Sequence, residues 1–220
     1  MKNIVGYKIE PLKNLLTQET IGYEVLSILQ HDTDTENYFS TLSCKKNIQL
    51  FYLQLDWCSR QKRDKKFFLN LSVAALTEST LCDSLTQRMV FPLCIEIQDP
   101  HSLSNLNSVR YAALSHNLYK LRSQGCEVWL DDFTAALTDV ASQPDFRFDG
   151  IKLDKSELLA GDTALHRTVA FCKTITTKVI VEGIETSRHL DSAVKSGADI
   201  GQGYLWEKEI IQSFDIKPVS

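Results

Sequence analysis

The sequence has no hydrophobic run that could cross a membrane and no recognisable secretion signal. None of its apolar runs approaches the roughly 20 residues of a membrane-spanning helix. Residues 1–5 are soon followed by charged side chains and lack the apolar core of a signal peptide. These absences predict a cytoplasmic protein with no membrane partner.

Positive charge and paired cysteines are also scarce. The 220 residues include 24 lysines and arginines against 28 aspartates and glutamates, a net charge of −4, which argues against direct nucleic-acid binding. The six cysteines contain no Cys-x-x-Cys pair, so neither a zinc knuckle nor a redox motif is indicated, and we expect them to be reduced and mostly buried. With no linker, repeat or low-complexity stretch, residues 1–220 are expected to form a single domain.

Short apolar runs alternate with longer segments of helical period, the pattern of βα units around a parallel sheet. The expected strands are residues 21–29, 66–73, 93–98, 127–132, 150–153, 178–181 and 200–205, and residues 6–12 fit a further strand. The expected helices are residues 36–60, 105–123, 163–176 and 186–196. The fold class is therefore α/β, and the length suits one TIM-like barrel, for which about 200 residues is the lower limit.

Polar side chains stand at or near the C-terminal end of each expected strand. They are Glu24, Asn70, Glu96, Asp131, Asp132, Lys152, Asp154, Glu182 and Gln202. Charged groups in apolar strands are costly to bury unless they are paired or bind metal. In a parallel barrel these strand ends converge on one mouth, where barrel enzymes place their chemistry. Oxygen ligands suit Mg²⁺ and Mn²⁺, and two such ions can drive an in-line displacement at phosphorus.

The same runs resemble the successive signature motifs of the EAL family, in the family's order, over residues 22 to 206. They are Glu24-Val25-Leu26, Asn70-Leu71-Ser72, Glu96-Ile97-Gln98-Asp99, Asp131-Asp132-Phe133, Lys152-Leu153-Asp154, Val181-Glu182-Gly183-Ile184-Glu185 and Gln202-Gly203-Tyr204. The resemblance implies a TIM-like (β/α)8 barrel with an antiparallel first strand. It also implies hydrolysis of cyclic di-GMP to pGpG with two Mg²⁺ or Mn²⁺ ions, which would lower cyclic di-GMP and so affect motility and biofilm.

The resemblance further implies a role for each matching residue. One metal would be held by Glu24, Asn70, Glu96 and Asp131, and the second by Asp131, Asp132 and Glu182. Lys152 would contact or orient the attacking water, so that Lys152, Glu182 and Asp131 form the catalytic group. The substrate-binding residues would be Leu26, Gln202 and Asp154. Asp99, where the family usually has a glutamate, would anchor the loop after the Asp-Asp pair.

Plainer structural roles remain open for several of these residues. Asp131, Asp132 or Asp154 could cap the helix that follows each of them, since aspartate favours such positions. Lys152 could serve only as an ion-pair partner of Asp131 or Glu182. Gln202 could make a strand-end hydrogen bond.

The chain also departs from the family pattern. Ile28 replaces the usual phosphate-binding arginine, and Thr134-Ala135-Ala136 replaces a glycine-rich loop. These departures leave an alternative open: a catalytically inactive EAL-like regulator that binds a protein partner such as a flagellar master transcription regulator. A homodimer is also compatible with the resemblance, because the family couples this loop to dimerisation.

Overall fold

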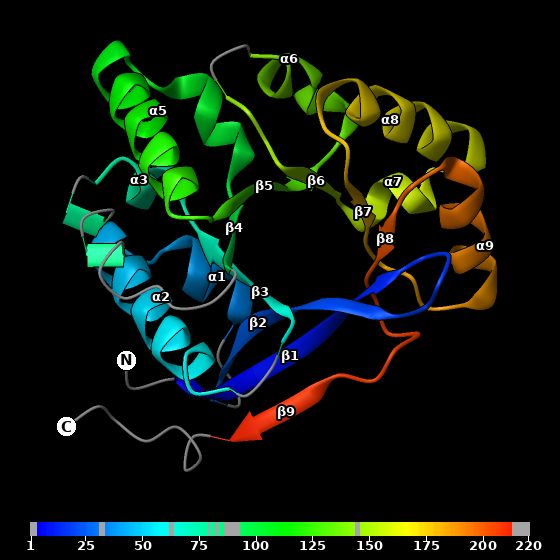
Figure 1. The fold of residues 1–220 in the computed structure, drawn as a ribbon, viewed down its shortest axis with the longest axis horizontal. Helices are drawn as coiled ribbons and strands as arrows, with labels where there is room; N and C mark the ends of the chain where they lie inside the picture. Colours follow the sequence, from blue (N-terminus) through cyan, green and yellow to red (C-terminus); the bar gives the residue numbers. More distant parts are fainter. Residues whose placement is uncertain are drawn as a thin grey trace.

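The computed structural model describes residues 4–30, 34–61, 64–78, 80–81, 84–85, 93–143 and 146–212. Strands surround a central axis and helices cover their outer side (Figure 1). The described strands are β1 (Ile4–Asn14), β2 (Thr20–Leu29), β3 (Lys66–Leu71), β4 (Leu93–Ile97), β5 (Glu127–Phe133), β6 (Gly150–Leu153), β7 (Val179–Val181), β8 (Ile200–Gly201) and β9 (Glu209–Gln212).

Strands β2 to β8 are parallel neighbours in chain order, and β1 closes the barrel between β8 and β2. Strand β1 runs antiparallel to both of them. Strand β9 pairs with β1 on the outer edge, opposite Gly6 to Ile9. The expected TIM-like barrel with an antiparallel first strand is thus confirmed.

The described helices lie between the strands. The α-helices are α1 (Thr35–Ser40), α2 (Cys44–Cys58), α3 (Val73–Leu76), α5 (Ser108–Ser123), α6 (Thr138–Ala141), α7 (Lys155–Leu159), α8 (Asp162–Ile175) and α9 (Ser187–Ser196). Two 3-10 helices are η1 (Pro100–Asn105) and η2 (Ala135–Leu137). Within the described ranges, none of the helices has both the length and the apolar character needed to span a bilayer.

The structure corrects two expected elements. Residues 36–60 form two helices, because the backbone leaves helical geometry after Ser40 and Ser43, the N-cap of α2, is extended (φ −63°, ψ 151°). The strand expected over residues 200–205 ends at Gly201. The chain then turns so close to Ile184 that a Cβ at Gly203 would lie 2.3 Å from the Ile184 carbonyl oxygen. The alternation pattern also does not predict β9.

The barrel interior is filled by one layer of apolar side chains that lies directly below the polar residues of the mouth. Its members are Leu12, Phe68, Cys94, Trp129, Ile180 and Ile200. The rings of Phe68 and Trp129 meet edge-to-face at 5.2 Å, and a Cβ at Gly150 would lie 2.1 Å from the Trp129 ring. Side chains two residues apart on a strand share a face, so each strand that supplies this layer places its next inward side chain at the mouth.

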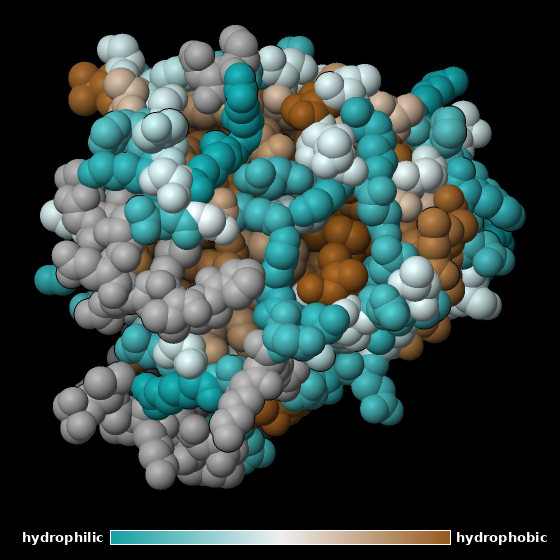
Figure 2. All heavy atoms as spheres, viewed as in Figure 1, coloured by the Kyte–Doolittle hydropathy of each residue, from teal (hydrophilic) through white to brown (hydrophobic). Residues whose placement is uncertain are grey.

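The main core lies between the strands and the helices, which cover the outer faces of β2 to β8. On the face drawn in Figure 2, hydrophilic side chains predominate among the coloured atoms, and hydrophobic ones gather near the centre and at the right of the view. Four cysteines, Cys58, Cys94, Cys126 and Cys172, are buried as expected; Cys44 is partly buried, and Cys82 lies outside the described residues. Burial is therefore concentrated in the barrel and beneath its helices.

Glu127, the first residue of β5, joins the N-terminal ends of several strands. Its carboxylate accepts hydrogen bonds from Lys66, from Lys178 Nζ (3.0 Å) and from Trp129 Nε1 (3.1 Å). Burial alone would raise the pKa of Glu127, but the two lysines outweigh it and hold this pKa at about 2. The ionised carboxylate is thus stabilised by folding.

Replacing Glu127 with glutamine should lower the free energy of unfolding by about 1–2 kcal/mol near neutral pH, a value reduced because the lysines are partly exposed. The lowered pKa makes this stabilisation complete above the ordinary value of 4.5 and progressively lost as pH falls toward about 2. Urea titrations at several pH values measure it. Exposed Glu207→Gln is the matched control, and equal stability of both variants at neutral pH would contradict the expectation.

Candidate metal centre at the barrel mouth

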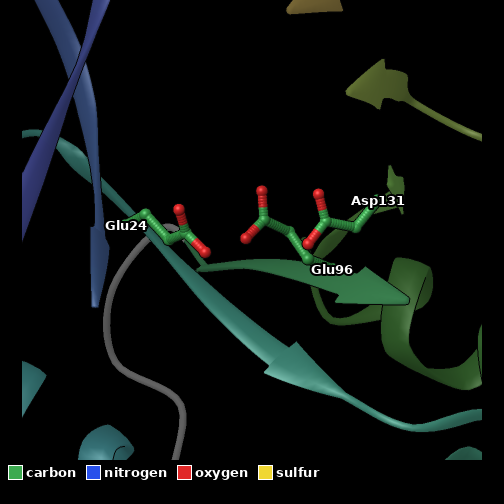
Figure 3. A group of neighbouring side chains, drawn as sticks. All are labelled: Glu24, Glu96 and Asp131. Carbon is green, nitrogen blue, oxygen red and sulfur yellow. The ribbon is translucent and has the colours of Figure 1, made fainter. Parts of the chain in front are cut away.

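Three buried carboxylates from β2, β4 and β5 meet at the mouth. Each of Glu24, Glu96 and Asp131 offers an oxygen that lies within 4.8 Å of the others. Figure 3 shows the three carboxylates side by side. Their exposed fractions are 3%, 0% and 6%, so water can compensate little of their charge.

Two amide side chains orient this group. Asn70 Nδ2 donates to Glu24 Oε1 (2.9 Å), while Gln202 Nε2 donates to Glu24 Oε2 (2.6 Å). Gln202 also donates to Glu10 Oε2 (2.9 Å). The Asn70 Oδ1 atom is buried and accepts no hydrogen bond from the described residues. An amide oxygen beside the Glu24 carboxylate is therefore available as a ligand.

Lys152 lies in the middle of the acidic group and is 1% exposed. Its Nζ is 2.8 Å from Glu182 Oε1, 3.1 Å from Glu24 Oε2, 3.2 Å from Asp131 Oδ1 and 3.5 Å from Glu96 Oε1. Burial disfavours its charge, but the four carboxylates outweigh burial and raise the pKa of Lys152 well above its ordinary value. Lys152 is therefore positively charged while buried, as required if it is an ion-pair partner of Asp131 or Glu182.

One ammonium does not balance four carboxylates. Burial and repulsion from Glu24 and Asp131 raise the pKa of Glu96 well above its ordinary value, although Lys152 acts in the opposite direction. Burial, with repulsion from Glu182 and Glu24, raises the pKa of Asp131 to about 8 despite Lys152. Of the four carboxylates around Lys152, Glu24 alone has a lowered pKa. Burial would raise the pKa of Glu24, but Lys152 and the two amides outweigh that effect. The single positive charge of Lys152 is therefore too small to balance these four carboxylates.

The buried oxygen atoms fit a hard divalent cation. Among the described residues, none donates a hydrogen bond to Glu96 Oε1, Glu96 Oε2 or Asp131 Oδ1. Lys152 Nζ lies 3.5 Å from Glu96 Oε1 and 3.2 Å from Asp131 Oδ1 without hydrogen-bond geometry. Together with Asn70 Oδ1 and the Glu24 carboxylate, these three oxygens form an all-oxygen donor set that includes three carboxylates. Such sets suit Mg²⁺ and Mn²⁺, whose charge would offset the repulsion.

A second acidic group lies beside the first, nearer the surface. Oxygens of Asp132, Asp154 and Glu182 lie within 4.8 Å of one another. Asp154 also caps α7 by accepting from Ser156 N (2.8 Å), so its cap interpretation is confirmed. Asp132 is no cap, because the N-cap of the following η2 is Thr134. This second group could hold a second cation.

The structure gives Asp99 a contact that differs from the predicted one. Asp99 Oδ1 accepts from Val73 N (2.6 Å), at the turn after β3. The loop after Asp131-Asp132 is instead contacted by Glu157 on α7, whose Oε1 accepts from Ala135 N (2.9 Å).

A pocket of about 380 Å³ opens over the first acidic group. Leu26 and Gln202, both predicted to bind substrate, line it, whereas Asp154 is not among its lining residues. Lys8 and Glu10 also line it, although no motif pointed to them. In the β1–β2 pairing Lys8 lies opposite Leu26 and Glu10 lies opposite Glu24. It is this strand pairing that places Lys8 and Glu10 at the pocket. Ile28 faces Gly6 in the same register.

Comparison with known proteins relates most of the chain to one family. The family model described as "EAL domain" matches residues 7–209. The cyclic di-GMP phosphodiesterase TpdA of Vibrio parahaemolyticus is 25% identical, over 90% of this chain and 36% of its own length. The chain therefore spans about a third of that relative.

Solved structures share the fold at low sequence identity. The FimX EAL domain of Pseudomonas aeruginosa bound to c-di-GMP is 18% identical, with a TM-score of 0.74, over 93% of this chain and 90% of that one. A manganese/cy-diGMP complex of Klebsiella pneumoniae BlrP1 is 16% identical, with a TM-score of 0.74, over 94% of this chain and 56% of that one.

Proposed function

Because this chain belongs to the EAL domain family, we propose that it is a cyclic di-GMP phosphodiesterase that produces linear pGpG with two divalent cations. The supporting observation is the buried excess of carboxylates at the barrel mouth, in contact with a pocket of about 380 Å³. By lowering cyclic di-GMP, the activity would affect motility and biofilm. The named activity of TpdA supports the substrate class.

The proposal assigns the donor atoms to two cations. Glu24, Asn70, Glu96 and Asp131 would hold the first. Asp131, Asp132 and Glu182 would hold the second, with Asp154 beside them as a further donor. When bound, two such ions can activate water and stabilise both the attacking and leaving oxygens of a displacement at phosphorus.

The chain's own residues would orient the reacting groups. Lys152 Nζ lies between Glu24, Glu182 and Asp131, where an ammonium can donate a hydrogen bond to the attacking water. Gln202 fixes the Glu24 carboxylate, and Leu26 forms part of the pocket wall. Lys8 lines the pocket opposite Leu26, which lies two positions before Ile28 on β2, so the Lys8 ammonium can contact a ligand phosphate in place of the usual arginine.

Incubation of the purified protein with cyclic di-GMP and Mn²⁺ tests the activity directly. We expect chromatography to detect pGpG, and we expect chelation of the cation to stop its formation. The absence of pGpG at stoichiometric protein, in a preparation that binds Mn²⁺, would reject the phosphodiesterase proposal.

Divalent cations should also stabilise the folded protein. Ligands that bind only the folded state raise the melting temperature, by an amount equivalent to about 2.7 kcal/mol at a hundredfold excess over Kd. Mn²⁺ should therefore raise the melting temperature, and Glu96→Gln should remove most of this rise because it removes a buried donor charge. Differential scanning calorimetry measures both.

Glu185→Gln is the matched control for this measurement, since Glu185 lines the adjoining pocket but belongs to neither acidic group. Its response to Mn²⁺ should equal that of the parent. An unchanged melting temperature of the parent protein at millimolar Mn²⁺ would reject the cation assignment.

An inactive regulator that binds a protein partner is the second candidate function. Ile28 supports it, because an aliphatic side chain cannot bind a phosphate at that position. For this candidate, the acidic group and Lys152 would be structural only. Cation-dependent formation of pGpG separates the two functions.

A further inference from the structure

The backbone at Asp131 and Asp132 departs from a regular strand. Consecutive side chains of a strand point to opposite faces, yet both of these carboxylates belong to acidic groups at the mouth. The β5–β6 register shifts between Leu130 and Phe133, and Asp132 has a φ of 49°, in the left-handed region. Aspartate tolerates this region better than most residues, but the conformation persists only where its surroundings hold it.

Contacts with α7 and α8 hold the chain just after Asp132. The Phe133 carbonyl accepts from Asp154 N (3.0 Å), and the Phe133 ring stacks on Phe171 at 6.3 Å and 9°. These contacts fix Phe133 itself. The following residues 134–137 include η2, are closed by a bond from Leu137 N to the Thr134 carbonyl (2.9 Å), and receive a further contact from α7.

Glu157 provides that contact from two sides. Its Oε1 accepts from Ala135 N (2.9 Å), and its Oε2 accepts from Thr168 Oγ1 (2.6 Å) on α8. Thr168 is only 6% exposed, so its hydroxyl is well placed to restrain the carboxylate. A charged acceptor makes a stronger hydrogen bond to a backbone N–H than a neutral one does. The bridge therefore connects the loop after Asp132 to a buried residue of α8.

We propose that Glu157 is a positioning residue: the Thr168–Glu157–Ala135 bridge holds the loop so that Asp132 keeps its left-handed conformation and its carboxylate stays with Asp154 and Glu182. The consequence for cations rests on the proposed function. The bridge itself is independent of it. Glu157 takes over the loop anchoring predicted for Asp99, whose carboxylate instead binds the turn after β3.

Amide hydrogen exchange in the metal-free protein tests the bridge without any reaction. In Glu157→Ala, the Ala135 N–H should exchange about ten times faster, the change that about 1.4 kcal/mol makes in an opening equilibrium. Glu157→Gln keeps an acceptor for Ala135 N and should restore most of the protection. Thr168→Val leaves the carboxylate unrestrained and should give an intermediate rate.

Calorimetric titration with Mn²⁺ tests the consequence for the second acidic group. Glu157→Ala should weaken the second of two binding events about tenfold and leave the first unchanged, while Glu157→Gln should resemble the parent. Unchanged Ala135 exchange in Glu157→Ala would overturn the bridge. Faster exchange with both Mn²⁺ affinities unchanged would overturn its role in positioning Asp132. A parent protein that binds one ion only would reject the two-cation proposal, while the exchange experiment would still decide on the bridge.

Discussion

Asp131→Asn is expected to lower the rate of cyclic di-GMP hydrolysis by more than about 100-fold while leaving the protein folded. Asparagine is nearly isosteric, but it removes the charge that both proposed cations would share. Loss of even a partner that only supports a metal ligand typically costs about 10–100-fold, so loss of a ligand should exceed that range. Steady-state formation of pGpG with Mn²⁺ measures the effect, and circular dichroism verifies the fold.

Asp149→Asn is the matched control, because Asp149 lies before β6, far from the mouth, where it accepts from Val128 N (2.8 Å). Its rate of hydrolysis should stay close to that of the parent. In cells, Asp131→Asn should raise cyclic di-GMP and lose the parent's effect on motility or biofilm. A fully retained cellular effect with soluble, normally melting Asp131→Asn protein would instead support the partner-binding function.

Lys152→Met should destabilise the metal-free protein strongly. Removing one partner of a buried ion pair typically costs about 3–5 kcal/mol, because a charge is left uncompensated. For a protein of this size that corresponds to a fall in melting temperature of about 6–20 °C. The effect should be largest at about pH 9, where Asp131, with its pKa raised to about 8, is mostly ionised. Saturating Mn²⁺ should restore much of the loss, because the cation supplies positive charge in its place.

Lys8→Met provides the comparison for Lys152→Met. Lys8 pairs with Glu10 (2.7 Å), and its side chain is 25% exposed. Isolated pairs that water still reaches contribute about 0–1 kcal/mol, so the melting temperature of Lys8→Met should change little. Similar melting of Lys152→Met and Lys8→Met would show that Lys152 does not balance the buried carboxylates.

The polar residues at strand ends could be predicted because strand geometry has a fixed period. Phe68 and Asn70, like Trp129 and Asp131, are two positions apart, so an apolar residue inside the barrel is followed by a polar residue at its mouth. Interruptions of regular structure were harder to predict. The helix expected over residues 36–60 is interrupted between Ser40 and Cys44 by the extended backbone of Ser43, which the hydrophobic period does not reveal.

The sequence by itself determined the alternation of strands and helices, the order of the motifs and most of the polar residues at the mouth, because each of those residues follows an inward apolar residue by two positions along its strand. Only the tertiary structure decided which of them touch. Glu24 and Lys152 are 128 positions apart and meet because closure brings β2 and β6 around one axis. Pairing of β1 with β2 likewise places Lys8 and Glu10 in the pocket. The contact of Glu157 with Ala135 also joins two elements through residues 22 positions apart, which the local sequence does not reveal.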